Sequence, residues 1–285
     1  MIPIIGGLGA ALAFAVSVLA SARASRLVGA PSTLAGAMVV GLAIGLPIAL
    51  LVSPPPDLSG TNLGLAAMAG FGNVSGLLLT YVAYRAGAVG VVSAIASTEG
   101  AIAAVIAVVA GEVLVPGSGV VLAVIAIGVA LAASAGGEEE GVPIPRDRAL
   151  RAAGLALGAA VCFAFGLYGA GRIASVLPLA WAILPARFVG VAFVAVPLAV
   201  TGRVRITRAA LPYVVATGVA EIVGYVAYTL GAREGIAVSA VLASMFAPIA
   251  AVAAFVVFRE RLSRRQIVGI ATIVVGVAAL GLLQS

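Results

Sequence analysis

The chain has 285 residues, of which 63% are hydrophobic and only 9% are charged, and its mean hydropathy is +1.26. Soluble domains carry about 25% charged residues, so a surface that faces water throughout is excluded. The net charge of +6 comes from 16 basic residues, all of them Arg. These Arg residues lie between apolar runs, which is typical of membrane orientation signals and not of nucleic-acid binding.

Charges, prolines and polar clusters divide the chain into ten apolar segments, each near the ~20 residues that cross a bilayer. Runs of this length favour helices over barrel strands. The chain is therefore predicted to be an all-α integral membrane protein with ten transmembrane helices. The first run lacks the basic region of a cleavable signal peptide and is expected to stay as a helix. The ten segments are 3–22, 32–52, 62–84, 88–110, 118–135, 149–171, 178–200, 209–231, 235–258 and 265–283.

The Arg residues predict the orientation. The loops that follow the odd-numbered segments contain 13 Arg residues, whereas those that follow the even-numbered segments contain only Arg172 and Arg233. Positively charged loops stay in the cytoplasm. The odd loops are therefore predicted to be cytoplasmic and both termini to lie outside.

An internal repeat relates the two halves of the chain. The tetrapeptide Tyr81-Val82-Ala83-Tyr84 recurs 144 residues later as Tyr225-Val226-Ala227-Tyr228. Further matches follow in the same order. We interpret residues 1–137 and 148–285 as two five-helix repeats, joined by an acidic linker at 138–147. An odd number of spans inserts the second repeat upside down, and matching loops indeed differ in their Arg content. Inverted repeats are typical of transporters.

A set of short motifs in the second repeat resembles a known family. The motifs are Val238-Ser239-Ala240, Pro248-Ile249-Ala250-Ala251, Arg259-Glu260-Arg261-Leu262-Ser263, Gln266-Ile267-Val268-Gly269 and Val275-Gly276-Val277. Their order and spacing are similar to the EamA-type repeat of the drug/metabolite transporter (DMT) superfamily. The first repeat keeps Glu112 and Leu114 but has Ala101 in place of Pro248.

The resemblance implies ten helices around a central cavity and secondary transport. Prokaryotic members of this family mostly export amino acids and other small metabolites, so the resemblance also implies an exporter of such compounds. Some members have cytoplasmic termini, whereas the Arg distribution here places both termini outside.

Three charged residues lie inside the predicted spans and clear of their ends, where charge is expensive and usually faces a cavity or a partner. Glu99 is either a proton-coupling carboxylate or a contact for a substrate ammonium group, or else an acid that packs helices together. Glu221 has the apolar Leu77 at its repeat position, which favours a specialised role. Arg187 follows Pro185 and is expected either to pair with one of these acids or to bind a substrate carboxylate.

Aromatic and polar residues give further candidates for the lining of a cavity. Tyr81 and Tyr225 are each followed three residues later by another tyrosine on the same helix face. They either line the cavity or form an interfacial belt, and their position near span ends favours the belt. The deeper candidates, for which ordinary helix packing is the alternative, are Asn73, Ser75, Phe163 and Tyr168.

Glycine and proline positions predict close packing and bending. The motifs Gly41-x-x-x-Gly45 and Gly154-x-x-x-Gly158 allow helices to approach closely. Pro248 is the candidate for a gating hinge, with a static kink as the alternative.

Composition also limits the function. With no His and a single Cys, Cys162, the usual zinc, Ser-His and Cys-His sites are excluded, as is an intrachain disulfide. No cofactor or metal is expected, and no Walker motif is present. A secondary transporter in a prokaryotic inner membrane is predicted, acting as a monomer or homodimer on a small molecule and using either a proton gradient or the substrate's own. A channel is the main alternative and an intramembrane lipid-modifying enzyme is a weaker one.

Overall fold

The computed structural model describes residues 1–57, 59–86, 92, 95–134, 145–249 and 264–283, and within these ranges it is helical without strands. The helices are α1 (Ile2–Val28), α2 (Ala30–Val52), α3 (Gly60–Ala86), α5 (Glu99–Val109), α6 (Ser118–Ser134), α7 (Arg146–Ala174), α8 (Leu179–Ala182), α9 (Pro185–Gly190), the π-helical η1 (Val191–Ala195), α10 (Val196–Val200), α11 (Leu211–Ala232), α12 (Ile236–Ala243) and α14 (Arg264–Leu283).

Six helical stretches in the described residues are long and apolar enough to span a membrane, and four shorter apolar helices accompany them. Each of the ten predicted segments overlaps one of these helices. The chain is therefore a multi-pass, all-α membrane protein. The prediction of ten complete spans stays a prediction, because four of the helices are shorter than a span.

Local sequence explains where the first helices begin and end. Both α1 and α2 start with a proline in the first turn, where the missing N–H would have no partner in the helix. Gly29 separates the two helices with a φ of 84°, a backbone conformation that glycine adopts without strain. Helix α2 then ends at Ser53, just before three consecutive prolines that cannot continue it.

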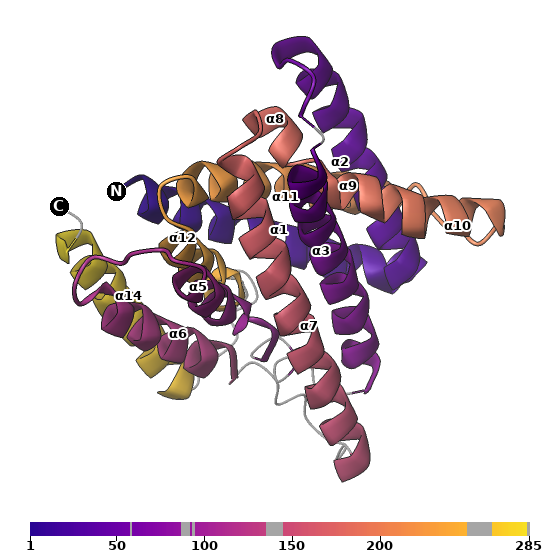
Figure 1. Cartoon of the computed structure of the whole chain (residues 1–285). Coiled ribbons are helices and arrows are strands. Elements are labelled where there is room, and N and C mark those ends of the chain that lie inside the picture. The colour runs from indigo at the N-terminus through magenta and orange to yellow at the C-terminus, as the bar shows by residue number, and fades with distance from the viewer. Residues whose placement is uncertain (58, 87–91, 93–94, 135–144, 250–263, 284–285) are drawn as a thin grey trace.

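The helices pack in a pattern that stays the same when the two halves of the chain are exchanged. Helix α3 of the first half packs along α7 of the second, and α11 of the second half packs along α1 of the first (Figure 1). Helices α5 and α12 pack against each other, as do α6 and α14. Small residues allow this closeness: at Gly72 an added Cβ would lie 2.6 Å from the carbonyl oxygen of Cys162.

Two predicted continuous spans are in fact interrupted. The segment 178–200 is broken at residues 183 and 184, between α8 and α9, where Pro185 begins a new helix, and α9, η1 and α10 then follow one another without a gap. The segment 88–110 contains a turn at Ser97 and Thr98, directly before α5. Glu99 is therefore the first residue of a helix and not the middle of one.

The second half contains a similar interruption. Residues 244 and 245 form a turn after α12, and helical residues resume at Phe246. This turn matches the one at Ser97 and Thr98 when Ala101 is aligned with Pro248. In both turns a hydroxyl group bonds to the carbonyl three residues earlier: Thr98 to Ile95 at 2.7 Å and Ser244 to Val241 at 2.7 Å.

Contacts between the helix ends join loops of the same predicted side. The indole Nε1 of Trp181, in α8, donates to the carbonyl oxygen of Pro54 at 2.9 Å, and both lie on the side predicted to be outside. The backbone N–H of Arg205 donates to Ser32 Oγ at 3.1 Å, and both lie on the side predicted to be cytoplasmic. The acidic linker at 138–147 and the Arg259–Ser263 motif lie largely or wholly outside the described residues.

Candidate functional site

A cavity of about 470 Å³ lies between helices from both halves of the chain. It is lined by residues of α1, α2, α3, α5, α7 and α11, together with Phe246 from the turn after α12. The cavity extends to Arg26, an exposed residue at the last turn of α1. Its volume is within the range that holds small organic ligands.

Two helices contribute to the lining from equivalent repeat positions. Residues spaced by four on α3 and α11 face the cavity, because a spacing of four keeps side chains on one helix face. The α3 set and the α11 set differ by 144 in residue number, which is the spacing of the sequence repeat. The two sets are Asn73, Leu77 and Tyr81 on α3, and Thr217, Glu221 and Tyr225 on α11.

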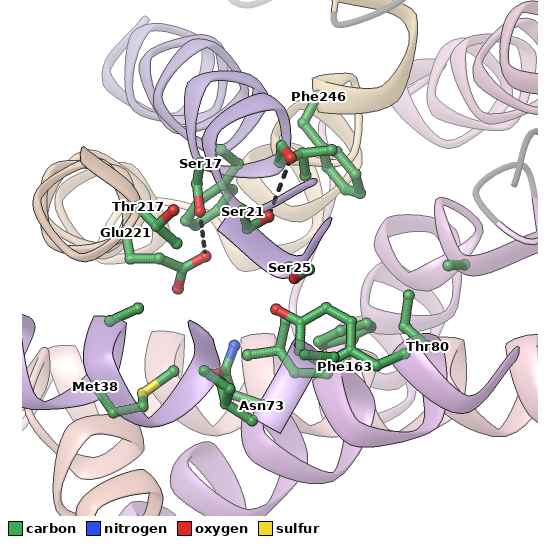
Figure 2. Close-up of a pocket in the computed structure, with 18 of the residues that line it drawn as sticks. Ser17, Ser21, Ser25, Met38, Asn73, Thr80, Phe163, Thr217, Glu221 and Phe246 are labelled. Carbon is green, nitrogen blue, oxygen red and sulfur yellow. Dashed lines mark hydrogen bonds between the residues drawn. The ribbon is translucent and has the colours of Figure 1, made fainter. Parts of the chain in front are cut away.

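Helix α1 adds a row of serines that the sequence reasoning missed. Ser17, Ser21 and Ser25 are spaced by four and line the same cavity. Figure 2 shows the three in sequence along this helix, near Phe246 and opposite Phe163 and Asn73. The spacing of hydroxyl residues within an otherwise apolar run is the signal that would have identified them.

Glu221 is held by two partners. Its Oε1 accepts a hydrogen bond from Ser17 Oγ at 3.0 Å, which Figure 2 shows as a dashed line. Its Oε2 lies 3.3 Å from Nη2 of Arg187 in a salt bridge. Both carboxylate oxygens of Glu221 are therefore occupied within the protein.

Arg187 lies behind the cavity wall and does not line the cavity. Its side chain is fully buried, and the guanidinium carbon is 5.0 Å from the ring centroid of Tyr225. Nη1 lies 3.3 Å from the sulfur of Met38. The interpretation that Arg187 binds a substrate carboxylate is thus disfavoured, whereas the alternative of an ion pair with an intramembrane acid agrees with the structure.

A glycine makes the room that this arginine needs. An added Cβ at Gly41 would lie 2.8 Å from Arg187 Cδ, and one at Gly45 would lie 2.6 Å from a methyl group of Leu184. The first Gly-x-x-x-Gly motif therefore packs against the broken segment that contains α9. In the second motif, an added Cβ at Gly154 would meet nothing within 4 Å.

Glu99 lines the cavity from the first turn of α5. Only 7% of the residue is exposed. Within the described residues no Arg forms a salt bridge with it. The aligned residue in the second half is Phe246, which also lines the cavity. The two halves therefore supply a carboxyl group and an aromatic ring from equivalent positions of the repeat.

Buried polar atoms without a partner gather at this cavity. Asn73 Oδ1 and Thr80 Oγ1 make no hydrogen bond, although both residues line the cavity and are more than nine-tenths buried. Leaving such an atom unsatisfied costs about 1–3 kcal/mol. Unsatisfied groups beside a hollow are therefore candidates for contact with a ligand.

The two tyrosines of the second motif are buried inside the protein and do not belong to an interfacial belt. Tyr225 is 4% exposed and packs edge-to-face on Phe14 with ring centroids 5.6 Å apart. Tyr228 is fully buried, and its hydroxyl donates to the carbonyl of Leu167 at 2.8 Å. Tyr81 also lines the cavity. The favoured belt interpretation is thus wrong for Tyr225, because α3 and α11 are covered by other helices at these levels.

Three candidates lie away from the main cavity. Ser75 is half-buried on α3 and does not line it. Tyr168 lines a separate hollow of about 220 Å³ at the other end of the helices. Pro248 is buried in the helical residues that follow the turn at 244 and 245. It has no N–H to donate to the carbonyl of Ser244, which accounts for a turn there, and its role as a hinge stays a prediction. Phe163, in contrast, lines the main cavity.

The end of the molecule near this smaller hollow is closely packed. Glu112 accepts hydrogen bonds from the backbone N–H groups of Ile236 (3.1 Å) and Ala237 (3.0 Å), and so caps the N-terminus of α12. Arg233 donates to the carbonyls of Ala174 and Leu177. These contacts join α5, α7, α11 and α12, and they lie on the side predicted to be outside.

Comparison with known proteins gives a family and a fold. Residues 150–282 match the model of the EamA-like transporter family. A crystal structure of a protein that is 16% identical has the same fold, with a TM-score of 0.77 over 99% of this chain and 96% of that one. No curated protein matches the sequence. The family match lies in the second half, and the likeness in fold extends to the first.

Proposed function

We propose that this chain, a member of the EamA-like transporter family by residues 150–282, is a secondary transporter that exports small organic metabolites through its central cavity. The observation that carries the proposal is the cavity itself, which is mainly apolar, carries a few polar and acidic side chains and is built from both halves. Members of this family are membrane transporters, which implies a small-molecule substrate and a surrounding lipid bilayer for this chain.

The arrangement of the helices supports two inverted halves. By the repeat, α1 corresponds to α7 and α3 corresponds to α11. Exchanging the halves therefore converts the packed pair α3–α7 into the packed pair α11–α1. The cavity-facing residues of α3 and α11 are related by the repeat spacing. Halves of this kind pack around a site near the middle of the membrane and expose it to each side in turn.

The cavity opens toward the side that the Arg distribution predicts to be cytoplasmic, from which an exporter takes up its substrate. The cavity extends to Arg26, next to loops rich in Arg, whereas the opposite end is closed by Glu112, Arg233 and close backbone contacts. At Gly6, for instance, an added Cβ would lie 2.6 Å from the carbonyl oxygen of Ala227. With Arg-rich loops in the cytoplasm of a prokaryotic cell, this conformation receives its substrate from the cytoplasm.

Flux measurements in proteoliposomes test the proposal. A panel of labelled amino acids, amines, nucleosides and sugars is supplied, and unlabelled solute is added on the opposite side. A carrier shows saturable flux that the solute on the other side accelerates. Flux that does not saturate, accompanied by ionic conductance, would instead identify a channel and overturn the proposal.

A pair of tryptophan variants ties the flux to the cavity. Ser21→Trp fills the cavity from α1, whereas Leu19→Trp adds the same ring on an exposed face of the same helix. We expect flux to fall at least tenfold in Ser21→Trp and to stay near wild type in Leu19→Trp. Equal flux in both variants would show that the solute does not pass through this cavity.

A further inference from the structure

Two carboxyl groups line the cavity, and within the described part of the chain only one of them has a cationic partner. Glu221 gives one oxygen to Arg187 and the other to Ser17. Glu99 forms no salt bridge with any described residue. The acid that remains available to a solute is therefore Glu99.

A buried, charged Glu99 needs a compensating cation. It lies in the first turn of α5, where the helix dipole favours a negative charge only weakly. This contribution is far smaller than the cost of burying an ion. A cationic group on a solute would supply the missing charge at a residue that is only 7% exposed.

The neighbouring polar groups also suit a solute that donates hydrogen bonds. Asn73 Oδ1 and Thr80 Oγ1 are buried acceptors without a partner, and both residues line the same cavity as Glu99. An ammonium group has several N–H donors and no acceptor. It can therefore satisfy a carboxylate and one of these oxygens together.

A carboxylate on the solute finds no comparable partner. Arg187 is fully buried behind the wall and is committed to Glu221. The basic residue on the described lining is Arg26, which is exposed at the open end, where water and salt screen its charge. Deeper in the cavity an anionic group would meet the carboxyl group of Glu99.

We infer that the transported solute is an organic amine that binds through its ammonium group to Glu99 and needs no carboxylate for recognition. Aromatic rings of Phe163 and Phe246 on the same lining favour a solute with an apolar body, and such rings also attract ammonium groups. The inference rests on the proposed carrier function and narrows its substrate class. Under it, an α-amino acid binds less tightly than its decarboxylated amine.

Three compounds with the same apolar skeleton test the inference on the purified full-length protein. Phenethylamine carries only an ammonium group, phenylalanine carries both charges, and 3-phenylpropionate carries only a carboxylate. Affinity is measured by titration calorimetry in detergent, with a thermal shift as a second readout. We expect phenethylamine to bind at least tenfold more tightly than phenylalanine and 3-phenylpropionate not to bind.

Variants of Glu99 provide the second arm. Glu99→Gln removes the charge and should weaken phenethylamine binding at least tenfold, whereas Glu99→Asp keeps the charge and should retain part of the affinity. Glu234→Gln, at an exposed acid away from this cavity, is the matched control and should bind as wild type does. The wild-type series remains decisive if a variant does not fold.

Each result decides the question. Absence of phenethylamine binding, a preference for phenylalanine, or unchanged affinity in Glu99→Gln would overturn the inference. Saturable, trans-stimulated flux of another solute would leave the carrier function standing in that case. Conversely, amine binding without flux of any solute would overturn the carrier function and leave the amine site intact.

Discussion

Nη2 of Arg187 lies 3.3 Å from Oε2 of Glu221, and these two residues from α9 and α11 form a salt bridge inside the membrane-spanning part of the protein. The arginine is fully buried, and its Nε has no hydrogen-bond partner. The pair therefore fixes the broken segment around α9 against α11, directly behind the cavity wall.

Removing one partner of this pair should be more harmful than removing both. In Glu221→Gln the buried guanidinium keeps its charge without a counterion, a situation that costs about 3–5 kcal/mol. The double variant Glu221→Gln with Arg187→Met removes both charges and should recover most of that loss. Unfolding in detergent measures both effects. Equal losses in the single and double variants would show that the ion pair does not support the fold.

The space at Gly41 makes a second, independent prediction about the same arginine. In Gly41→Ala the new methyl group would lie 2.8 Å from Arg187 Cδ, and overpacking of this kind costs about 1–3 kcal/mol. Gly154→Ala is the matched control, because nothing lies within 4 Å of the added group. Alanine is also a better helix former, so this control should be neutral or slightly more stable. Thermal unfolding of both variants is the measurement. An unfolding midpoint of Gly41→Ala at or above that of wild type would refute the packing argument.

The cap on α12 predicts how the closed end is held together. Glu112→Ala removes the acceptor of two backbone N–H groups, and losing a cap costs about 0.5–2 kcal/mol. Because the cap joins the two halves, its loss should also open this end. Ser239 is fully buried nearby, and a Ser239→Cys substitution in a Cys162→Ala background reports the opening.

Labelling of this cysteine by a membrane-impermeant maleimide should be faster with Glu112→Ala than without it. Glu234→Ala, at an exposed acid near the same end, serves as the control and should leave the rate unchanged. A rate that Glu112→Ala does not alter would mean that the cap plays no part in closing this end.

Much of the architecture could be predicted from the sequence because the bilayer imposes it. Apolar run length located the helices, and each predicted segment overlaps one of them. The spacing of 144 between the tyrosine motifs indicated that Tyr81 and Tyr225 occupy equivalent positions, and both indeed line one cavity. The family resemblance, drawn from motifs in the second half, is confirmed for residues 150–282.

The details of the site depend on how the helices pack together and could not be predicted from the sequence. Hydropathy treats 178–200 as one run, whereas the helix breaks before Pro185, and Arg187 does not line the cavity. Nothing in the sequence determined which acid Arg187 would pair with. The belt interpretation of Tyr225 was wrong because Phe14 and other neighbours cover this residue on α11. The serine row on α1 was predictable from its spacing of four but was overlooked among many small residues.

Cysteine labelling of two matching loops tests the inverted arrangement of the halves, on which the transport mechanism depends. Ser59 lies in the loop between α2 and α3, and Val204 lies in the equivalent loop of the second half, between α10 and α11. Each is replaced by cysteine in a Cys162→Ala background and exposed to a membrane-impermeant maleimide on intact cells. The account predicts that Ser59→Cys is labelled from outside and that Val204→Cys is labelled only after the cells are permeabilised. Labelling of both cysteines from the same side would contradict it.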